Sequence, residues 1–415
     1  MIKTNFRLFV ALVLLALSLN AGAVTNAQSG ATRPRRVTPT PPTPENTSGN
    51  NAASAQPSAR TNPATSGTAT RTVPASGGTN DTTRAYALLQ QKQYEAALEE
   101  ARRIAASDAT NSEAWKIAGF AEVNLNRFAE AVTDLQRALE LQRAAGAEDE
   151  NTVDALARAY VRTEKYAEAL PLLVAATTRA GKQPDPFLIY YRGLAEYRTD
   201  KKTDAERSFN QAVKADPKNA AALYYLGRIA FERQDNDAAI NALNRATLGD
   251  ARLAEAWTLL TYAYLRRADK LGEGAKADAD YLSAVRASEG LTRVKTDEAS
   301  TMLHAQALIR AKLYLRAATA LERVVAANPN AQGATLYLLG FAHSRAKNYP
   351  KAASALERAA AKTPDDANIY RELGYIHEVT KQYAKALAAY EKGLSLAPDD
   401  AYFKEAAERV RPFAK

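Results

Sequence analysis

The sequence contains no cysteine and only three histidines among its 415 residues. Without cysteine, the chain can form no disulfide framework, thiolate metal site or cysteine nucleophile. A bacterial lipoprotein anchor is excluded as well, because that anchor is attached to a cysteine after the leader. Three histidines also leave few nitrogen ligands for a metal and few general bases for catalysis. The composition therefore points away from most enzymes and metal proteins.

Excess charge of one sign is small outside the N-terminal part of the chain. The formal net charge is +9, but residues 1–83 hold seven Lys/Arg against two Asp/Glu, so 48 basic and 44 acidic residues remain beyond them. A nucleic-acid-binding domain needs basic charge concentrated on a folded surface. We therefore expect no nucleic-acid partner.

A long apolar run occurs at residues 8–19, between Lys3 and Arg7 on one side and the small residues 21–23 on the other. This order of basic, apolar and small residues predicts a secretory signal peptide over residues 1–23. The run is shorter than the roughly 20 apolar residues that span a bilayer. We therefore expect an exported chain in a bacterial periplasm, at the cell surface or outside the cell, with no transmembrane segment after cleavage.

Residues 24–82 are rich in Thr, Ser, Pro and Asn and include the segment TPTPPTP at 38–44. They show no apolar periodicity and cannot bury a core, which predicts a disordered linker. A stalk that carries sugars or crosses a cell wall has the same composition, so this alternative stays open.

From residue 84 the composition changes to Ala, Leu, Glu, Lys, Arg and Tyr, with apolar residues three and four apart, as in amphipathic helices. An alanine recurs in nine units, usually with a small residue twelve positions earlier and an aromatic residue three positions earlier. We expect two antiparallel helices in each unit, with the small residue of the first helix against the alanine of the second. The recurring alanines are Ala97, Ala131, Ala169, Ala205, Ala239, Ala284, Ala317, Ala352 and Ala386.

This frame resembles the tetratricopeptide repeat, most clearly at Leu373-Gly374, Tyr383, Ala386 and Pro398. The resemblance implies an all-α fold, a right-handed superhelical solenoid of about nine helical hairpins over residues 83–400. A C-terminal capping helix is expected at 401–415. Residues 266–280 form an insertion, for which a solvated loop and extended helix ends both remain open.

Catalytic and metal-binding motifs are incomplete. The segment HEVTK at 377–381 begins like a zinc-protease helix, but Lys381 stands where that helix needs its second histidine. His377 and His343 occupy equivalent repeat positions, which favours packing or hydrogen bonding between helices over metal binding. The segment at 269–280 lacks the residues of a phosphate loop or a calcium loop. We expect no enzyme, no metal and no cofactor.

In proteins with this resemblance the first helices line the concave face, and here their exposed positions are aromatic and cationic. Tyrosine and arginine often dominate protein-binding energy, so we expect a partner-binding groove there. Five of the arginines share one position near a helix end, so they are interpreted either as cations that complement the helix dipole or as a site for acidic peptide. The expected groove residues are Phe120, Arg158, Arg162, Tyr190, Tyr197, Arg198, Tyr224, Arg228, Phe231, Tyr262, Arg266, Arg310, Tyr337, Phe341, Arg345, Arg371 and Tyr375.

The expected function is that of an exported, non-enzymatic scaffold or assembly factor that binds proteins or extended segments, acidic ones included. This expectation rests on the resemblance and on the groove composition. The alternative is an envelope factor that binds or helps to export polysaccharide, with the aromatic residues stacked on sugar rings. Oligomeric state has no signal in the sequence.

Overall fold

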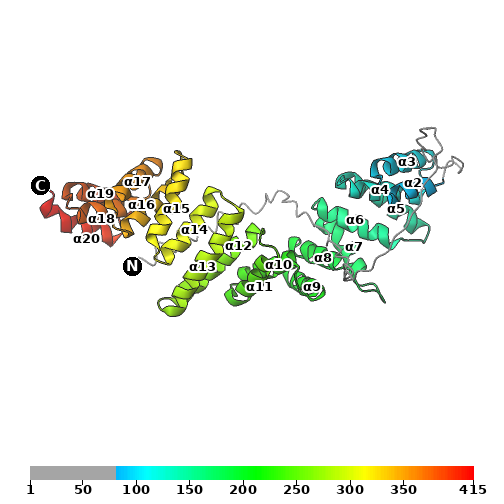
Figure 1. Cartoon of the computed structure of the whole chain (residues 1–415), viewed down its shortest axis with the longest axis horizontal. Helices are drawn as coiled ribbons and strands as arrows, with labels where there is room; N and C mark the ends of the chain where they lie inside the picture. The colour runs from blue at the N-terminus through cyan, green and yellow to red at the C-terminus, as the bar shows by residue number, and fades with distance from the viewer. Residues whose placement is uncertain (1–80) are drawn as a thin grey trace, which may run out of the picture. The chain divides into compact units, whose positions relative to one another are not determined.

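The computed structural model describes residues 81–415, which form nineteen α-helices and one short 3-10 turn without a strand (Figure 1). The predicted signal peptide, and the predicted linker except for its last two residues, lie outside this range. The helices are α2 Thr83–Gln90, α3 Tyr94–Ser107, α4 Ser112–Asn124, α5 Phe128–Ala144, α6 Glu150–Arg162, α7 Tyr166–Thr177, α8 Pro186–Arg198, α9 Lys202–Ala215, α10 Ala220–Glu232, α11 Asn236–Gly249, α12 Ala254–Leu271, α13 Ala275–Val294, α14 Glu298–Arg310, α15 Tyr314–Ala327, α16 Gly333–Arg345, α17 Tyr349–Lys362, α18 Ala367–Val379, α19 Tyr383–Leu396 and α20 Ala401–Val410, followed by the turn Arg411–Phe413.

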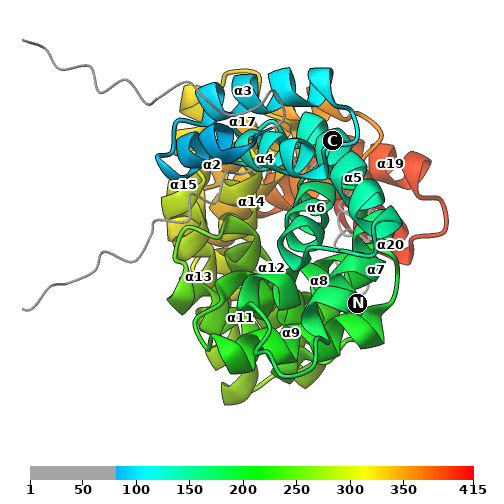
Figure 2. The same cartoon turned by 90° about the vertical axis from the view of Figure 1, so that its right-hand side faces the viewer.

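Consecutive helices pair into nine hairpins, α2–α3 to α18–α19, which we number 1 to 9. Each second helix also packs on the first helix of the next hairpin, and α20 covers α19. Figures 1 and 2 show the hairpins following one another in chain order, each turned relative to its neighbour. The predicted all-α solenoid of nine hairpins with a C-terminal capping helix is confirmed for the described residues.

First helices of neighbouring hairpins also lie against each other, as in α4–α6, α10–α12 and α14–α16. No second helix of the described residues lies comparably close to another second helix. The first helices therefore form the inner, more crowded side of the stack, and the side chains that point away from their own hairpins line this side.

The helix ends follow from local sequence. Seven first or capping helices begin after an Asp or Asn whose side chain accepts a hydrogen bond from a backbone N–H of the first turn. Asn111, for example, accepts from the Ala114 N–H at 3.0 Å. Prolines such as Pro217 and Pro398 stand two residues after second helices, because proline cannot continue a helix.

Eight of the nine hairpin turns contain a non-glycine residue in the left-handed backbone conformation, with φ between 59° and 65°. Each closes the preceding first helix by two backbone hydrogen bonds; in hairpin 8 these run from Lys347 N to Ser344 O and from Asn348 N to His343 O. Hairpin 6 is the exception and turns through Gly272 and Gly274. The eight residues are Lys92, Asn126, Glu164, Asp200, Gln234, Lys312, Lys347 and Lys381.

The nine recurring alanines are all fully buried, as expected. The glycine of the first helix lies close to the backbone of this alanine, as in Gly227 and Ala239, but it faces more closely a larger side chain sixteen residues later. A methyl group on Gly227 would lie 2.5 Å from Leu243 Cγ, and one on Gly193 would lie 2.8 Å from Phe209. The small residue therefore makes room for a leucine or an aromatic ring, one turn beyond the alanine.

The insertion at 266–280 consists of extended helices joined by a short turn. Helix α12 continues to Leu271, and α13 begins at Ala275. The Arg267 guanidinium makes two 2.7 Å hydrogen bonds to the buried Asp280 carboxylate and fixes the two extensions to each other. The open alternative from the sequence is therefore resolved in favour of packed helices.

No helix between residues 81 and 415 has the length and apolar character needed to cross a membrane.

Candidate binding surface on the first helices

The first helices α8 and α10 bring together a cluster of aromatic residues that includes Tyr190, Tyr197 and Tyr224 from the predicted groove. All three rings lie near Tyr225, with centroid separations of 6.4, 5.3 and 5.2 Å. Burial raises the pKa of Tyr190, Tyr197 and Tyr224, so their hydroxyls stay protonated. The cluster gives these three tyrosines fixed positions on the inner side.

Tyr225 was not predicted as a groove residue. Its ring stacks on Phe209 of α9 at 5.1 Å and 7°, so it connects the inner tyrosines to the core of hairpin 4. The adjacent tyrosines 224 and 225 point to different sides of one helix, and the sequence frame assigned only the first of them to the groove.

Arg228 lies at the centre of a polar network on α10. Its guanidinium stands over the Tyr197 ring at 5.3 Å and donates a hydrogen bond to Glu232 Oε1 at 3.2 Å. Glu232 also accepts from the Tyr197 hydroxyl at 2.5 Å and pairs with Lys202 at 2.9 Å. Despite partial burial, these hydrogen bonds and cations lower the pKa of the Glu232 carboxyl. Arg228 is therefore already matched by an acid of its own hairpin.

The five arginines at the shared helix-end position each lie over an aromatic ring. Three of them reach a ring on the second helix of the preceding hairpin: Arg162 over Phe128 at 4.3 Å, Arg198 over Tyr166 at 5.4 Å, and Arg310 over Tyr281 at 5.3 Å. Arg266 lies over Phe231 at 3.7 Å, and Arg345 lies over Phe341 at 4.4 Å. These positions stabilise the contact between hairpins in addition to the helix ends.

Five groove arginines also pair with carboxylates, most of them on a neighbouring hairpin or on the capping helix. Arg158 pairs at 2.6 Å with Asp185, the residue that caps α8, and Arg371 pairs with Asp400, which caps α20. Arg345 binds the buried Glu372 at 2.8 Å. Arg228 pairs with Glu232, and Arg310 pairs with Asp269. Much of the positive charge expected in the groove is thus balanced internally.

Arg162 and Arg198 differ from the others, because both side chains are exposed and neither forms an ion pair with a carboxylate of residues 81–415; Glu164 acts on Arg198 only from a longer distance. They stand at equivalent positions of α6 and α8. They are the predicted groove cations that remain available to an incoming carboxylate.

The other predicted groove residues lie farther along the stack. Tyr337 and Phe341 of α16 have ring centroids 6.2 Å apart, and Arg345 also stands over Tyr375 of α18 at 5.5 Å. This second group belongs to hairpins 8 and 9. Phe120 packs by itself against the core of hairpins 2 to 5, and Tyr262 is half-buried on α12.

His343 and His377 of the first helices α16 and α18 are buried among helices. His343 Nε2 lies 3.2 Å from Glu322 of the preceding hairpin, and burial lowers the pKa of both His343 and His377. No group of three His, Asp or Glu side chains in residues 81–415 is arranged to hold a metal ion.

A comparison with protein-family models matches residues 190–256 and 337–401 to the tetratricopeptide repeat. No curated protein matches the sequence. Among solved structures, a tetratricopeptide repeat protein from Parabacteroides merdae is similar with 16% identity and a TM-score of 0.38, over 63% of this chain and 98% of that one. MamA from Desulfovibrio magneticus is similar with 21% identity and a TM-score of 0.37, over 44% and 96%.

YrrB, described as a repeat protein of this type with an unusual peptide-binding site, is similar with 16% identity and a TM-score of 0.39, over 48% and 97%. At these TM-scores the likenesses carry no argument, so the fold rests on the hairpins themselves. The two matched segments begin within α8 and α16 and run through α11 and α19, and the other hairpins repeat the same frame. Residues 190–256 and 337–401 thus match the tetratricopeptide repeat and lie within a continuous array of nine hairpins.

Proposed function

We propose that this protein is an exported, non-enzymatic scaffold that binds a partner protein along its first helices. The supporting observation is the row of aromatic rings on α8 and α10 beside the exposed Arg162 and Arg198, which form no ion pair with residues 81–415. Rigid aromatic area and arginine are the features that most often dominate protein-binding energy. Tetratricopeptide repeats are typical of protein-interaction scaffolds, which agrees with this assignment.

The two exposed arginines favour a partner segment with a carboxylate, because a guanidinium binds a carboxylate through two parallel hydrogen bonds. The alternative, binding of envelope polysaccharide by stacking, requires open ring faces. Arg228 covers one face of Tyr197, Arg266 covers one face of Phe231, and Arg345 covers one face of Phe341. The ring surface therefore suits protein contacts better than sugar stacking.

The binding experiment uses the full chain to capture partners from the envelope fraction of source cells, followed by calorimetric titration with the purified partner. The variant Arg162→Gln/Arg198→Gln removes two groove charges. The control Arg127→Gln/Arg245→Gln removes two exposed charges that have no acidic partner among the described residues. We expect the groove variant to raise Kd by about tenfold or more and the control to leave it within about twofold. Equal effects of both variants would contradict the groove assignment.

Export is tested separately by mass spectrometry of the mature N-terminus. We expect the chain recovered from the envelope to begin close to residue 24. A cytoplasmic chain that retains residues 1–23 would remove export from the proposal and leave the groove assignment unaffected.

A further inference from the structure

Hairpin 7 departs from the repeat frame in its first helix, α14. The departure lies four residues before the small residue, which is Ala305 in this helix. Seven other hairpins place a large apolar or aromatic side chain there, whereas α14 has Thr301. Its neighbour at the next core position is His304, where leucine is the commonest residue in this chain. The seven equivalents of Thr301 are Trp115, Val153, Ile189, Leu223, Trp257, Leu336 and Tyr370.

The large residue at this position normally covers the second helix. Trp257 packs directly on Gly290 of α13, and the Tyr370 ring lies beneath Lys392 of α19 at 6.0 Å. The residue of α15 equivalent to Gly290 and Lys392 is Arg323. Thr301 is too short to cover Arg323, so the space that the ring fills elsewhere remains open.

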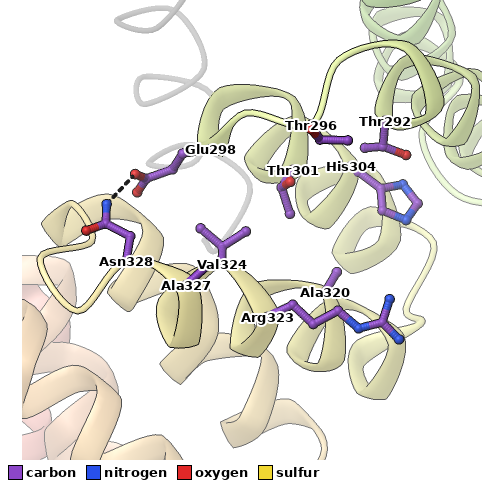
Figure 3. Close-up of a pocket in the computed structure, with 10 residues that line it drawn as sticks. All are labelled: Thr292, Thr296, Glu298, Thr301, His304, Ala320, Arg323, Val324, Ala327 and Asn328. Atoms are coloured by element: carbon purple, nitrogen blue, oxygen red, sulfur yellow. Dashed lines mark hydrogen bonds between the residues drawn. The ribbon is translucent and has the colours of Figure 1, made fainter.

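The result is a hollow of about 590 Å³ between the end of α13, helix α14 and helix α15 (Figure 3). Figure 3 shows Glu298 and Asn328 at one end, and His304 and Arg323 at the other. A second hollow of about 320 Å³ shares His304, Ala320 and Arg323 and continues toward Leu315. The polar residues that line the larger hollow are Thr292, Thr296, Glu298, Thr301, His304, Arg323 and Asn328.

Arg323 brings to the hollow a positive charge that no nearby carboxylate neutralises. Its side chain is exposed and forms no ion pair or hydrogen bond with residues 81–415. The one carboxylate in the lining, Glu298, is already engaged: Oε1 accepts from the Thr335 hydroxyl at 2.5 Å and the Gln332 N–H at 3.1 Å. An incoming carboxylate therefore finds a free guanidinium at the Arg323 end, while the negative charge of Glu298 stays at the opposite end of the hollow (Figure 3).

His304 supplies a hydrogen-bond acceptor. Its Nδ1 lies 2.9 Å from the Ser288 hydroxyl, which donates its only hydrogen to the Val285 carbonyl at 2.8 Å. In the arrangement in which the hydroxyl donates to the Val285 carbonyl, Nδ1 carries the proton and Nε2 of the neutral ring is an acceptor. Burial keeps the ring neutral by lowering the pKa of His304. An acceptor beside a guanidinium matches a molecule that has a hydroxyl next to its carboxylate.

We propose that the hollow of hairpin 7 binds a small hydroxylated carboxylate, with the carboxylate on Arg323 and a hydroxyl donated to His304 Nε2. The volume suits a ligand of one or two sugar-acid units. The threonine hydroxyls and the Asn328 amide provide further polar contacts, and Ala320, Val324 and Ala327 provide an apolar wall. None of these residues belongs to the predicted groove, so the proposal goes beyond the scaffold function and does not rest on it.

The test measures Kd for galacturonate with the full chain by ligand-observed NMR, with galactose as the probe that lacks the carboxylate. Arg323→Gln removes the charge, and Thr301→Trp fills the hollow with the residue found in hairpins 2 and 6. Arg245→Gln removes the equivalent arginine of hairpin 5, where Leu223 fills the space. Circular dichroism establishes that each variant is folded.

We expect saturable galacturonate binding, at least about tenfold weaker galactose binding, and a loss of about tenfold or more in Arg323→Gln and Thr301→Trp. Arg245→Gln should bind like the parent chain. Trigalacturonate separates the two sources of this chemistry: tighter binding than the monomer indicates an acidic polymer that reaches the second hollow, and equal binding indicates a free acid. Equal affinity for galactose, undiminished binding by Arg323→Gln, or no saturable binding by the parent chain would overturn the proposal.

Discussion

The non-glycine residues with left-handed backbone in the hairpin turns lower the stability of the folded chain. A non-glycine residue in this conformation costs about 1 kcal/mol or more, because its Cβ crowds the backbone. Lys347, with φ 62°, closes α16 without a glycine. We therefore expect Lys347→Gly to stabilise hairpin 8 by about 1 kcal/mol, measured as a higher midpoint of thermal unfolding.

Asn126 provides the control for this prediction. It has nearly the same φ of 61°, but asparagine adopts left-handed backbone more easily than lysine. Asn126→Gly should therefore give a smaller gain than Lys347→Gly. A decrease in the unfolding midpoint on Lys347→Gly would mean that relief of turn strain is outweighed by the greater freedom of glycine in the unfolded chain.

Glu122 makes the stability of the folded chain depend on pH. Its carboxyl is fully buried, receives a 2.5 Å hydrogen bond from Arg102 and lies near the buried Asp134. Burial and the neighbouring acid raise the pKa of Glu122 to about 8. The folded chain therefore binds this proton more tightly than the unfolded chain, and this group's contribution to stability falls as pH rises from about 4.5 to about 8.

The variant Glu122→Gln should lose most of this decrease in stability with rising pH, because glutamine does not titrate. We expect the variant to gain stability relative to the parent chain between pH 5 and pH 8.5, in thermal unfolding at constant ionic strength. Neutral His343 and His377 act in the opposite direction, because their lowered pKa values favour the folded state above the ordinary histidine pKa. They are present in both proteins, so the difference between the two reports the coupled Glu122–Asp134 pair. A parallel pH dependence of both proteins would contradict the assignment.

At the scale of the hairpin, the distance between two helices is set by a pair of residues sixteen positions apart. In hairpin 9 this pair is Gly374 and Tyr390, and a methyl group on Gly374 would overlap the fully buried ring. We expect Gly374→Ala to destabilise the protein by about 1–3 kcal/mol, because a buried ring cannot move aside. Chemical denaturation measures the change.

Hairpins 3 and 7 already contain the matched alternative, since Ala157 stands opposite Leu173 and Ala305 opposite Leu321. The double variant Gly374→Ala/Tyr390→Leu copies that pair into hairpin 9. It should recover part of the stability that Gly374→Ala loses. If the double variant is as unstable as the sum of the two single variants, the two positions do not act as a pair.

The α12–α13 extension predicts a proteolysis pattern. Arg266 and Arg267 lie within α12 and hydrogen-bond to Asn236, Asp280 and other groups. Trypsin should therefore spare the bonds after them, and within 266–280 the first cuts should follow Lys270 or Lys276, beside the exposed turn. Mass spectrometry of early fragments identifies the sites. Early cleavage after Arg266 would indicate that the extension opens in solution.

At the scale of the whole array, stability depends on contacts between neighbours. Helix α20 covers α19 with the buried Phe403 and holds α18 through the Arg371–Asp400 pair. We expect deletion of residues 401–415 to speed amide hydrogen exchange in α18 and α19 and leave α2–α5 unchanged. Uniformly faster exchange would show that the array unfolds as one unit.

Periodicity was enough to predict the hairpins, because small, aromatic and alanine positions recur wherever two helices must approach each other. The partners of the arginines could not be predicted in this way. Arg162 and Arg371 contact Phe128 and Asp400, which belong to other elements, and only the stacking of hairpins brings them together. The hollow of hairpin 7 was missed because a departure from the frame, such as Thr301, carries no meaning until its opposite residue is known.

The contacts between first helices, without comparable contacts between second helices, give the array an unequal stiffness. Bending that spreads the second helices disturbs few of their mutual contacts, whereas separating the first helices breaks ring contacts such as Tyr197–Tyr225 and ion pairs such as Arg158–Asp185. We therefore expect the array to bend more easily by changes in the spacing of the second helices than by separation of the first helices. A partner bound along the first helices would fix the spacing of these helices and thereby also limit changes in the spacing of the second helices.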